Sequence, residues 1–296
     1  MTHLFIVGGN GVLGSAAAKF FLNEGFKVSV LVRDRNKATE LEKAGANVVT
    51  GDITKPEDVR NIFNGVDVVL TAAHGMLGKG KNRSENVDDT GHRRLIDEAK
   101  SSGVKQFIYT SAVNVSENHP VDFYRTKYKI EQYLKSSGLN YTVLRLPAFM
   151  EWHVYNLLGK NIVDKGKVTI LGSGTNPLNF IAVKDIVSAL ELMVLNEDFF
   201  CKAINIGGPE NLSRNQVAER FGNALKINPK ISHVPTSMLK VFSVLLKPFH
   251  PGIARIMELT IHFEKSNETM DKNFSIEKFG LKPTTIDEFI YSVIGK

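Results

Sequence analysis

The stretch from His3 to Phe26, HLFIVGGNGVLGSAAAKFFLNEGF, constrains the fold more than any other part of the chain. Its first part, Leu4 to Val7, is an unbroken apolar run that is too short for a helix and typical of a central parallel strand. Glycines follow at once, and then small and aromatic residues at helical spacing. Strand, glycine turn and helix in this order predict a dinucleotide-binding unit.

The glycines have a physical reason in such a unit. A pyrophosphate lies against backbone N–H groups at the helix N-terminus, and a Cβ atom in the turn would hold it away. A Cβ atom at Gly14 would also push the helix off the strand. We therefore expect cofactor contacts along the whole turn, from Gly8, Gly9, Asn10, Gly11, Val12, Leu13 and Gly14.

The second predicted strand, Lys27 to Arg33, ends where the adenosine ribose of the cofactor would lie. NAD-binding sites usually place an acidic residue there, whereas this chain has Arg33. A guanidinium group can bind a 2′-phosphate with paired hydrogen bonds, so this position favours NADP(H) over NAD(H). The alternative is that Arg33 is merely exposed and that Asp34 binds the ribose.

Strands and helices alternate through the first half of the chain, which predicts right-handed crossovers and a doubly wound, Rossmann-type parallel sheet. A glycine- and lysine-rich segment from Gly75 to Asn86 is predicted to be a mobile loop. The expected strands are 47–50, 67–72, 106–110 and 141–144, and the expected helices are 36–44, 56–63, 87–102 and 121–136.

Residues at the ends of these strands are the next candidates for the site. Asp52 could contact the adenine amino edge, and His74, at the mouth of the predicted crevice, is a candidate catalytic group. Thr71, Ala72 and Ala73 are small residues at a strand end, as expected where the cofactor crosses close to the backbone. The remaining predicted cofactor contacts also follow or end predicted strands: Ile53, Ser111 and Pro147.

Several motifs occur together in one order: GGNGVLG, VLVR, QFIYTSA, TKYKIEQYLKSSGLNYTVLR, FIAVKDIVSAL, INIGGPENLS and FGLKPTTIDEFI. With these motifs the chain resembles the atypical short-chain dehydrogenases/reductases of the NmrA-like kind, which are related to isoflavone-reductase-like proteins. The resemblance implies binding of NADP(H) or NAD(H). It also implies either reduction of quinone- or enone-like substrates or cofactor sensing without turnover.

The resemblance also implies a catalytic set of Ser, Tyr and Lys, with the Tyr four residues before the Lys on one helix face. The Lys would be Lys127, and four residues earlier stands Phe123, which has no proton to give. The serine position is filled by Ala112, unless the alignment is shifted by one residue to Ser111. We therefore expect Lys127 to bind the nicotinamide ribose and to act electrostatically, without the usual tyrosine.

An aromatic stretch follows Pro147, which would turn the chain over the nicotinamide end. It is either the packed core of a loop or the wall of a substrate site, and a flat, apolar acceptor would suit the second role. The predicted substrate contacts are Phe149, Met150, Trp152 and His153, and His153 is also a candidate catalytic group.

The remainder is predicted to be a small, mostly helical lobe. We expect residues 1–150 to form the NAD(P)-binding domain and residues 151–296 a smaller substrate-binding lobe that is interleaved with it. Asp185 is predicted to cap a helix, and Ser213 to cap another. The apolar segment from Pro235 to Phe263 could lie on a membrane, but its prolines and few basic residues favour a cover over the substrate cleft.

The composition excludes several classes of protein. The net charge of +6 is scattered, and its densest run, Lys79 to Arg83, is predicted to be a solvated loop beside an anionic cofactor, not a nucleic-acid patch. The single cysteine, Cys201, excludes an internal disulfide and fits a reducing compartment. No apolar run could span a bilayer, no signal peptide is evident, and no cluster has metal-site spacing, so we expect a cytoplasmic protein without a metal.

The sequence therefore predicts an NADP(H)-dependent oxidoreductase that passes hydride to an apolar small molecule such as a quinone or an enone. A second interpretation, favoured by Phe123 and Ala112, is a redox-sensing regulatory protein that binds NADP(H) and a protein partner without turnover. A third is a nucleotide-sugar epimerase or reductase, which shares the two-lobe plan but needs the tyrosine.

Overall fold

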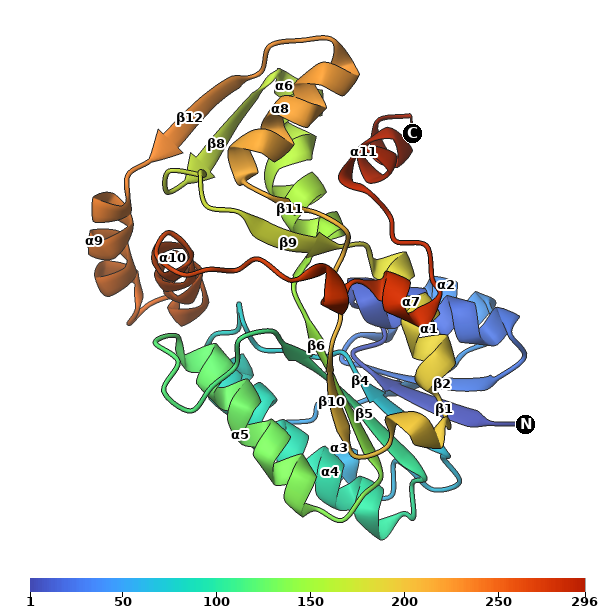
Figure 1. Cartoon of the computed structure of the whole chain (residues 1–296). Coiled ribbons are helices and arrows are strands. Elements are labelled where there is room, and N and C mark those ends of the chain that lie inside the picture. Colours follow the sequence, from blue (N-terminus) through green and yellow to red (C-terminus); the bar gives the residue numbers. More distant parts are fainter. Residues whose placement is uncertain (296) are drawn as a thin grey trace. The chain divides into compact units, whose positions relative to one another are not determined.

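The computed structural model describes residues 1–295, which form two compact units (Figure 1). The first unit consists of Met1–Arg145 and Val187–Ile204, and the second consists of Leu146–Ile186 and the chain from Asn205 onward. The chain thus leaves the first unit after Arg145, returns to it for one segment and then leaves again.

A central seven-stranded sheet organises the first unit, with the strand order β10-β6-β5-β4-β1-β2-β3. β1 pairs in parallel with both β2 and β4, and β2–β3 and β4–β5 are also parallel pairs. The predicted doubly wound sheet is confirmed. The strands are β1 (His3–Val7), β2 (Lys27–Val32), β3 (Asn47–Thr50), β4 (Val68–Thr71), β5 (Gln106–Ala112), β6 (Tyr141–Leu146) and β10 (Lys202–Asn205).

Helices cover the sheet on both faces, with α3, α4 and α5 on one side and α1 and α2 on the other (Figure 1). β1 is buried along its whole length, as an unbroken apolar run requires between two helical layers. The helices of this unit are α1 (Val12–Asn23), α2 (Thr39–Lys43), α3 (Pro56–Val59), α4 (His92–Ser101) and α5 (Asp122–Ser136), with short 3₁₀ turns at Arg35–Ala38, Gly80–Asn82 and Glu197–Phe199.

Three expected helices differ from those in the structure. The helix expected over 36–44 is a 3₁₀ turn, Arg35–Ala38, followed by α2, Thr39–Lys43. The helix expected over 56–63 ends at Val59, and Asn61 adopts a left-handed conformation with φ 59°. The helix expected over 87–102 begins as a π-helix, Glu85–Gly91, before α4. There the His92 ring bonds the Val87 carbonyl at 2.9 Å, so a side chain occupies a backbone acceptor at the point where the two helix types meet.

A buried ion pair joins β6 to α5. The Glu131 carboxylate is fully buried and accepts hydrogen bonds from the Arg145 guanidinium, at 3.0 Å to Nε and 2.5 Å to Nη2. The Ser111 hydroxyl donates to the same carboxylate at 2.6 Å. These bonds fix the carboxyl end of β5 against α5 through one buried group.

The second unit is smaller and mostly helical, as predicted. It contains a three-stranded sheet with the order β11-β9-β7 and a parallel pair of β12 and β8. Its strands are β7 (Ala148–Phe149), β8 (Lys167–Leu171), β9 (Leu178–Ile181), β11 (Asn211–Leu212) and β12 (Lys230–Val234). Its helices are a π-helix, Met150–Gly159, followed by α6 (Lys160–Lys165), α8 (Arg214–Leu225), α9 (Thr236–Leu246), α10 (Pro251–Phe263) and α11 (Ile286–Ile294), with 3₁₀ turns at Lys272–Phe274 and Ile276–Phe279.

The α7 helix (Val183–Met193) carries the chain from the second unit back to the first. Asp185 lies in its first turn, and its carboxylate accepts hydrogen bonds from the backbone N–H and the hydroxyl of Thr284, at 2.8 and 2.7 Å. The Asp185 side chain therefore ties two distant segments of the second unit together. That Asp185 caps α7 stays a prediction.

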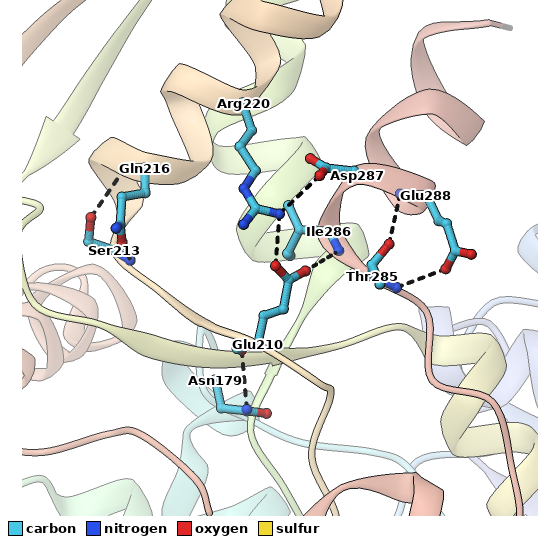
Figure 2. A network of polar contacts seen from close by, with 9 residues as sticks. All are labelled: Asn179, Glu210, Ser213, Gln216, Arg220, Thr285, Ile286, Asp287 and Glu288. Carbon is cyan, nitrogen blue, oxygen red and sulfur yellow. Dashed lines mark hydrogen bonds and ion pairs between the residues drawn. The ribbon is translucent and has the colours of Figure 1, made fainter. Parts of the chain in front are cut away.

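Glu210 is the centre of a polar network in the second unit (Figure 2). Its carboxylate pairs with Arg220 of α8 at 2.8 Å and accepts the backbone N–H of Ile286, the first residue of α11, at 2.9 Å. Ser213, as predicted, caps α8, and Thr285 caps α11, each in a capping box. Glu210 thereby connects Arg220, in the middle of α8, to the N-terminus of α11.

In the described residues, 1–295, we find no helix with both the length and the apolar character that crossing a membrane requires.

The buried Glu131–Arg145 pair generates a stability prediction. Removing Arg145 leaves the fully buried Glu131 carboxylate without its charge partner, so Arg145→Met should lower the free energy of unfolding in urea by about 3–5 kcal/mol. The double variant Glu131→Met/Arg145→Met should regain most of that loss, since it leaves no unpaired charge. A double variant that is as unstable as Arg145→Met would contradict this account of the pair.

Candidate functional site

The glycine turn leaves β1 between its two neighbouring strands. Gly8 has φ +89°, and a Cβ atom there would lie 2.8 Å from the backbone nitrogen of Ala73. A Cβ atom at Gly9 would lie 2.5 Å from Cβ of Val30 in β2, and one at Gly14 would lie 2.2 Å from the carbonyl oxygen of Gly8. These three glycines are therefore required by the packing of the turn itself.

Gly11 differs from the other glycines of the turn. A Cβ atom there would meet only the Gly8 carbonyl oxygen, at 3.2 Å, and nothing else within 4 Å. Gly11 is the N-cap of α1, and no side chain caps this helix. The N–H groups of Val12, Leu13 and Gly14 have no partner within the helix, so they form an open donor set for an anion.

A cavity of about 620 Å³ lies beside this turn, in the first unit. Asn10 of the turn lines it, together with residues after β2 and β3 and residues of the loop that was predicted at 75–86. Four of the lining side chains are cationic: Arg33, Lys37, Lys55 and Lys81. Of these, Arg33 was a predicted cofactor contact, and Lys81 was predicted only as part of a cationic loop.

Three carboxylates also line the cavity, and each is engaged in local structure. Asp34 accepts the backbone N–H of Asn36, and Asp58 accepts that of Asp52. Asp52 accepts the N–H and the hydroxyl of Thr54, at 3.0 and 2.8 Å. Burial raises the pKa of Asp52, but these bonds and the charges of Arg33 and Lys81 outweigh it, so that the pKa lies below its ordinary value.

The cationic side chains that line the cavity make fewer hydrogen bonds and ion pairs than its carboxylates do. Within residues 1–295, the side chains of Arg33, Lys37 and Lys81 form no hydrogen bond or ion pair, whereas Lys55 lies 4.0 Å from Asp58. Arg35, by contrast, pairs with Glu42 and donates to the Val48 carbonyl at 3.1 Å. The cavity therefore offers free positive charge to an anionic ligand.

Asn82 adds an unpaired acceptor to the same cavity. Its Oδ1 atom is buried and has no hydrogen-bond partner among the described residues. An amide oxygen in this state is a site for a ligand donor, because a buried acceptor without a partner is unfavourable. The exocyclic amine of adenine is such a donor.

The other predicted cofactor contacts of the first unit surround the carboxyl ends of β4 and β5. Ala72 and Ala73 are partly exposed, and Ala73 faces Gly8. Thr71 is fully buried, Ile53 lies in the apolar core, and Ser111 donates to Glu131. The side chains of the last three are thus occupied by the protein itself.

Lys127 of α5 reaches the end of β5 from the helix layer. Its Nζ donates to the Thr110 carbonyl at 2.8 Å and lies 5.0 Å from the centre of the Tyr109 ring. Burial lowers the pKa of Lys127, and the negative charges of Asp88 and Glu131 oppose that shift. The structure therefore holds an ammonium group at the strand end where the nicotinamide ribose was predicted.

The neighbours of Lys127 include the residue at the tyrosine position. The Phe123 ring lies 5.2 Å from Lys127 Nζ, so the two side chains share one helix face, as their spacing implies. Tyr124 instead stacks on His119 at 4.4 Å. The His74 ring packs edge-on against Phe123 at 6.2 Å. Loss of hydration lowers the pKa of His74, while Asp88 opposes and Lys127 reinforces this shift.

Asp88 is a buried charge that was not among the predicted site residues. It accepts the Gly75 N–H at 3.0 Å and the Ser84 hydroxyl at 2.5 Å, and it lies among the groups that contribute to the pKa of Lys127. The nearby His92 is fully buried, and burial lowers its pKa to about 4. Both residues lie on the π-helical turn or at its end, which no local sequence pattern predicts.

The predicted substrate contacts lie in the second unit, together with Pro147. Met150 is fully buried in the apolar core of that unit, while Trp152 is exposed. Phe149 ends β7 and is partly exposed. Burial and the charge of Arg214 lower the pKa of His153 to about 4, so this ring is neutral at physiological pH. Their contact with a substrate stays a prediction.

No group of three or more His, Cys, Asp or Glu side chains within residues 1–295 is arranged to hold a metal ion.

Comparison with known proteins confirms the resemblance that the motifs predicted. The model of the NmrA-like family matches residues 2–290. Photosystem II assembly factor Ycf39 of Cyanophora paradoxa is 28% identical over 96% of this chain and 89% of its own length. NAD(P)H azoreductase of Xenophilus azovorans is 27% identical over 75% of this chain and 73% of its own.

Solved structures share the fold. An NADPH-dependent quinone oxidoreductase of Escherichia coli, in complex with NADPH, has a TM-score of 0.77 at 19% identity and covers 98% of this chain and 99% of its own. The binary complex of leucoanthocyanidin reductase from Vitis vinifera with NADPH has the same TM-score and identity, over 99% and 100% of the two chains. At this identity the likeness establishes the fold alone.

The glycine geometry predicts unequal effects of two similar substitutions. Gly14→Ala places a Cβ atom against the Gly8 carbonyl and should lower the free energy of unfolding by about 1–3 kcal/mol. Gly11→Ala, whose Cβ atom would meet only one carbonyl oxygen, at 3.2 Å, should lower it less, by about 1 kcal/mol or less. Urea unfolding of both variants checks this, and equal losses would show that the turn is not packed as described.

Proposed function

The chain belongs to the NmrA-like family, and on that premise we propose that it is an NADP(H)-dependent oxidoreductase that passes hydride to an apolar acceptor, quinone-like before carbonyl. The observation that carries the proposal is the cavity beside the glycine turn, with its free cations and unpaired amide oxygen. The azoreductase relative and the quinone oxidoreductase structure support the same class of reaction.

The residues of the first unit fit NADP(H) part by part. The open N–H groups at the start of α1 would bind the pyrophosphate, and Gly11 leaves room for its approach. Arg33 would bind the 2′-phosphate, since it lies after β2 and its side chain forms no hydrogen bond or ion pair within residues 1–295. Asn82 Oδ1 would accept from the adenine amino group, next to Asp52, which is occupied by Thr54.

Lys127 would position the nicotinamide end. Its ammonium group, fixed by the Thr110 carbonyl, can donate to a ribose hydroxyl and stabilise negative charge that develops on an acceptor oxygen. Bound NADPH supplies the hydride. A quinone oxygen can take its proton from water, so the reaction does not need the tyrosine that Phe123 replaces. Reduction of a simple carbonyl would need that proton donor.

The proposed role of Arg33 predicts how the protein chooses between NADPH and NADH. Arg33→Ala should raise the Kd for NADPH by roughly tenfold to a hundredfold, because it removes a charge-assisted contact to the 2′-phosphate. The Kd for NADH should stay within about twofold, since NADH lacks that group. Fluorescence titration of the purified protein with each cofactor measures both constants.

The chain offers matched controls for this experiment. Arg35 lies two residues after Arg33 and does not line the cavity, so Arg35→Ala removes an equal charge outside the site. In the loop, Lys81 lines the cavity and Lys79 does not. Arg35→Ala and Lys79→Ala should leave the ratio of the two Kd values unchanged, whereas Lys81→Ala should lower the preference for NADPH. An Arg33→Ala protein that keeps its preference would refute the assignment.

The proposed role of Lys127 predicts how turnover responds to substitution and to pH. The purified protein should consume NADPH with one of a panel of quinones, enones and aldehydes, and Lys127→Met should lower kcat/KM roughly a hundredfold. Burial lowers the pKa of Lys127 below 10.5, so its ammonium group loses its proton before the pH reaches that value. Turnover by the wild-type protein should therefore decrease at alkaline pH below 10.5. In Lys127→Arg the side chain stays charged, so the decrease should occur at a higher pH. Quinone reduction that survives Lys127→Met unchanged would refute its role.

A second candidate function is an NADP(H)-binding regulatory or assembly protein without turnover. Phe123 beside Lys127 favours it, because the helix carries no phenol on that face, and the Ycf39 relatives, named as assembly factors, fit it. It predicts tight NADPH binding with no consumption of NADPH by any acceptor in the panel. The panel therefore separates the two candidates directly.

A further inference from the structure

His74 is a titratable group to which the proposed reaction gives no role. It follows β4 and the small residues Ala72 and Ala73, and Ala73 faces Gly8 of the glycine turn. Its imidazole is exposed, and within residues 1–295 it forms no hydrogen bond or ion pair. A group that can take and give protons is therefore open to a ligand at the carboxyl end of the sheet.

The backbone beside His74 is held by the residue that follows it. Both carboxylate oxygens of Asp88 accept the Gly75 N–H, at 3.0 Å each, and the Ser84 hydroxyl donates to the same carboxylate at 2.5 Å. Gly75 and Asp88 are both buried. The His74 side chain thus extends from a fixed point of the chain, as a group that must meet a reacting atom requires.

The His74 ring lies against the residue at the tyrosine position. Its centre is 6.2 Å from that of the Phe123 ring, and the two ring planes meet at 79°, edge to face. Lys127 Nζ lies 5.2 Å from the centre of the same Phe123 ring. An imidazole and an ammonium group therefore contact one apolar ring, at the place where the resemblance implied a phenol and an ammonium group.

The charged and titratable groups around His74 come from three elements. Loss of hydration lowers the pKa of His74 below 6.5, and Lys127 of α5 reinforces this shift while Asp88 of the π-helix opposes it. His92, at the start of α4, has a pKa of about 4 and adds no charge at neutral pH. The His74 imidazolium is therefore a stronger acid than an ordinary one, and it forms as the pH falls.

We propose that His74 donates the proton to the oxygen of the acceptor, and that the acceptors therefore include enones as well as quinones. This role rests on the hydride transfer proposed above. The hydride adds to the β-carbon of the enone, and the C=C electron pair moves toward the oxygen to give an enolate. The His74 imidazolium transfers its proton to that oxygen, and the enol returns to the ketone in water. The exposed imidazole then takes a proton from solvent.

Acceptors differ in how much they need this proton. Hydride addition to a quinone leaves a phenolate oxygen, which is a weaker base than the enolate oxygen formed from an enone. A general acid contributes more to the rate when the oxygen that forms is more basic. Removing His74 should therefore slow the reduction of an enone strongly and that of a quinone little.

Rates of NADPH consumption with two acceptors of similar size, 2-cyclohexenone and 1,4-benzoquinone, test this role. His74→Gln should lower kcat/KM for the enone by roughly a hundredfold and for the quinone by less than about threefold. His233→Gln, at an exposed histidine of the second unit, should change neither value. Imidazole added to His74→Ala should restore part of the enone rate, which a purely structural loss would not allow.

The pH dependence provides a second readout. Only the protonated ring donates, so enone reduction by the wild-type protein should decrease as the pH rises through the pKa of His74, which lies below 6.5. Quinone reduction should show no decrease in that range, and neither should the remaining enone reduction by His74→Gln.

Proton NMR titration of the imidazole C–H signals needs neither cofactor nor turnover. The signal that is absent from His74→Gln identifies His74. Its pKa should rise in Lys127→Met, because that variant removes the neighbouring positive charge. Thermal unfolding verifies that the variants fold.

The outcomes separate this role from the proposed reaction. A His74→Gln protein that reduces the enone as fast as the wild type, or that loses both acceptors equally, overturns the role of His74 and leaves the hydride transfer in place. A His74 pKa that stays the same in Lys127→Met overturns the shared site. A wild-type protein that consumes NADPH with neither acceptor refutes the hydride transfer itself and the role of His74 with it.

Discussion

The first unit depends on one close approach of backbone to backbone. β1 lies between β2 and β4, so the turn that leaves it contacts the neighbours on both sides, through Gly9 against Val30 and Gly8 against Ala73. That approach places the start of α1 over the carboxyl ends of the strands, at the point where the strand order reverses. The segments after β2 and β3 end at the same edge, which is why a cavity forms beside the turn and why its charges gather there.

Features that depend on residues close together in the sequence could be predicted from it. The apolar runs predicted the strands of the sheet, and Arg33 could be predicted because its position follows directly from the end of β2. Lys55, Lys81 and Asn82 could not be predicted as members of the same cavity, because only the folded chain brings them together. The helix expected over 56–63 failed for a similar reason, since the Asn61 N–H is satisfied by the Glu98 side chain, 37 residues away.

The buried charges around Lys127 also could not be predicted from the sequence. Asp88 and Asp89 are adjacent in the sequence and look alike, yet Asp88 is fully buried and Asp89 pairs with Arg93 in the usual i, i+4 manner. The π-helical turn rotates Asp88 inward, where it holds Gly75 and Ser84. One negative charge thereby fixes the start of a glycine-rich loop and opposes the loss of the proton from Lys127. No periodicity distinguishes the two residues beforehand.

The α9–α10 hairpin shows how exposure changes the weight of a sequence argument. The prolines and scarce lysines of this segment favoured a cover over a cleft, because a basic amphipathic helix is the usual sign of a membrane surface. The structure shows what the pattern left open: Leu239 and Ser243 of α9 are buried, whereas its other large apolar side chains, Met238, Val241, Phe242 and Leu245 among them, are exposed to solvent. Lys247 pairs with Glu258 of α10, so the hairpin carries charges of both signs. Exposure in the folded chain therefore bears on the role of this segment more directly than its number of charges does.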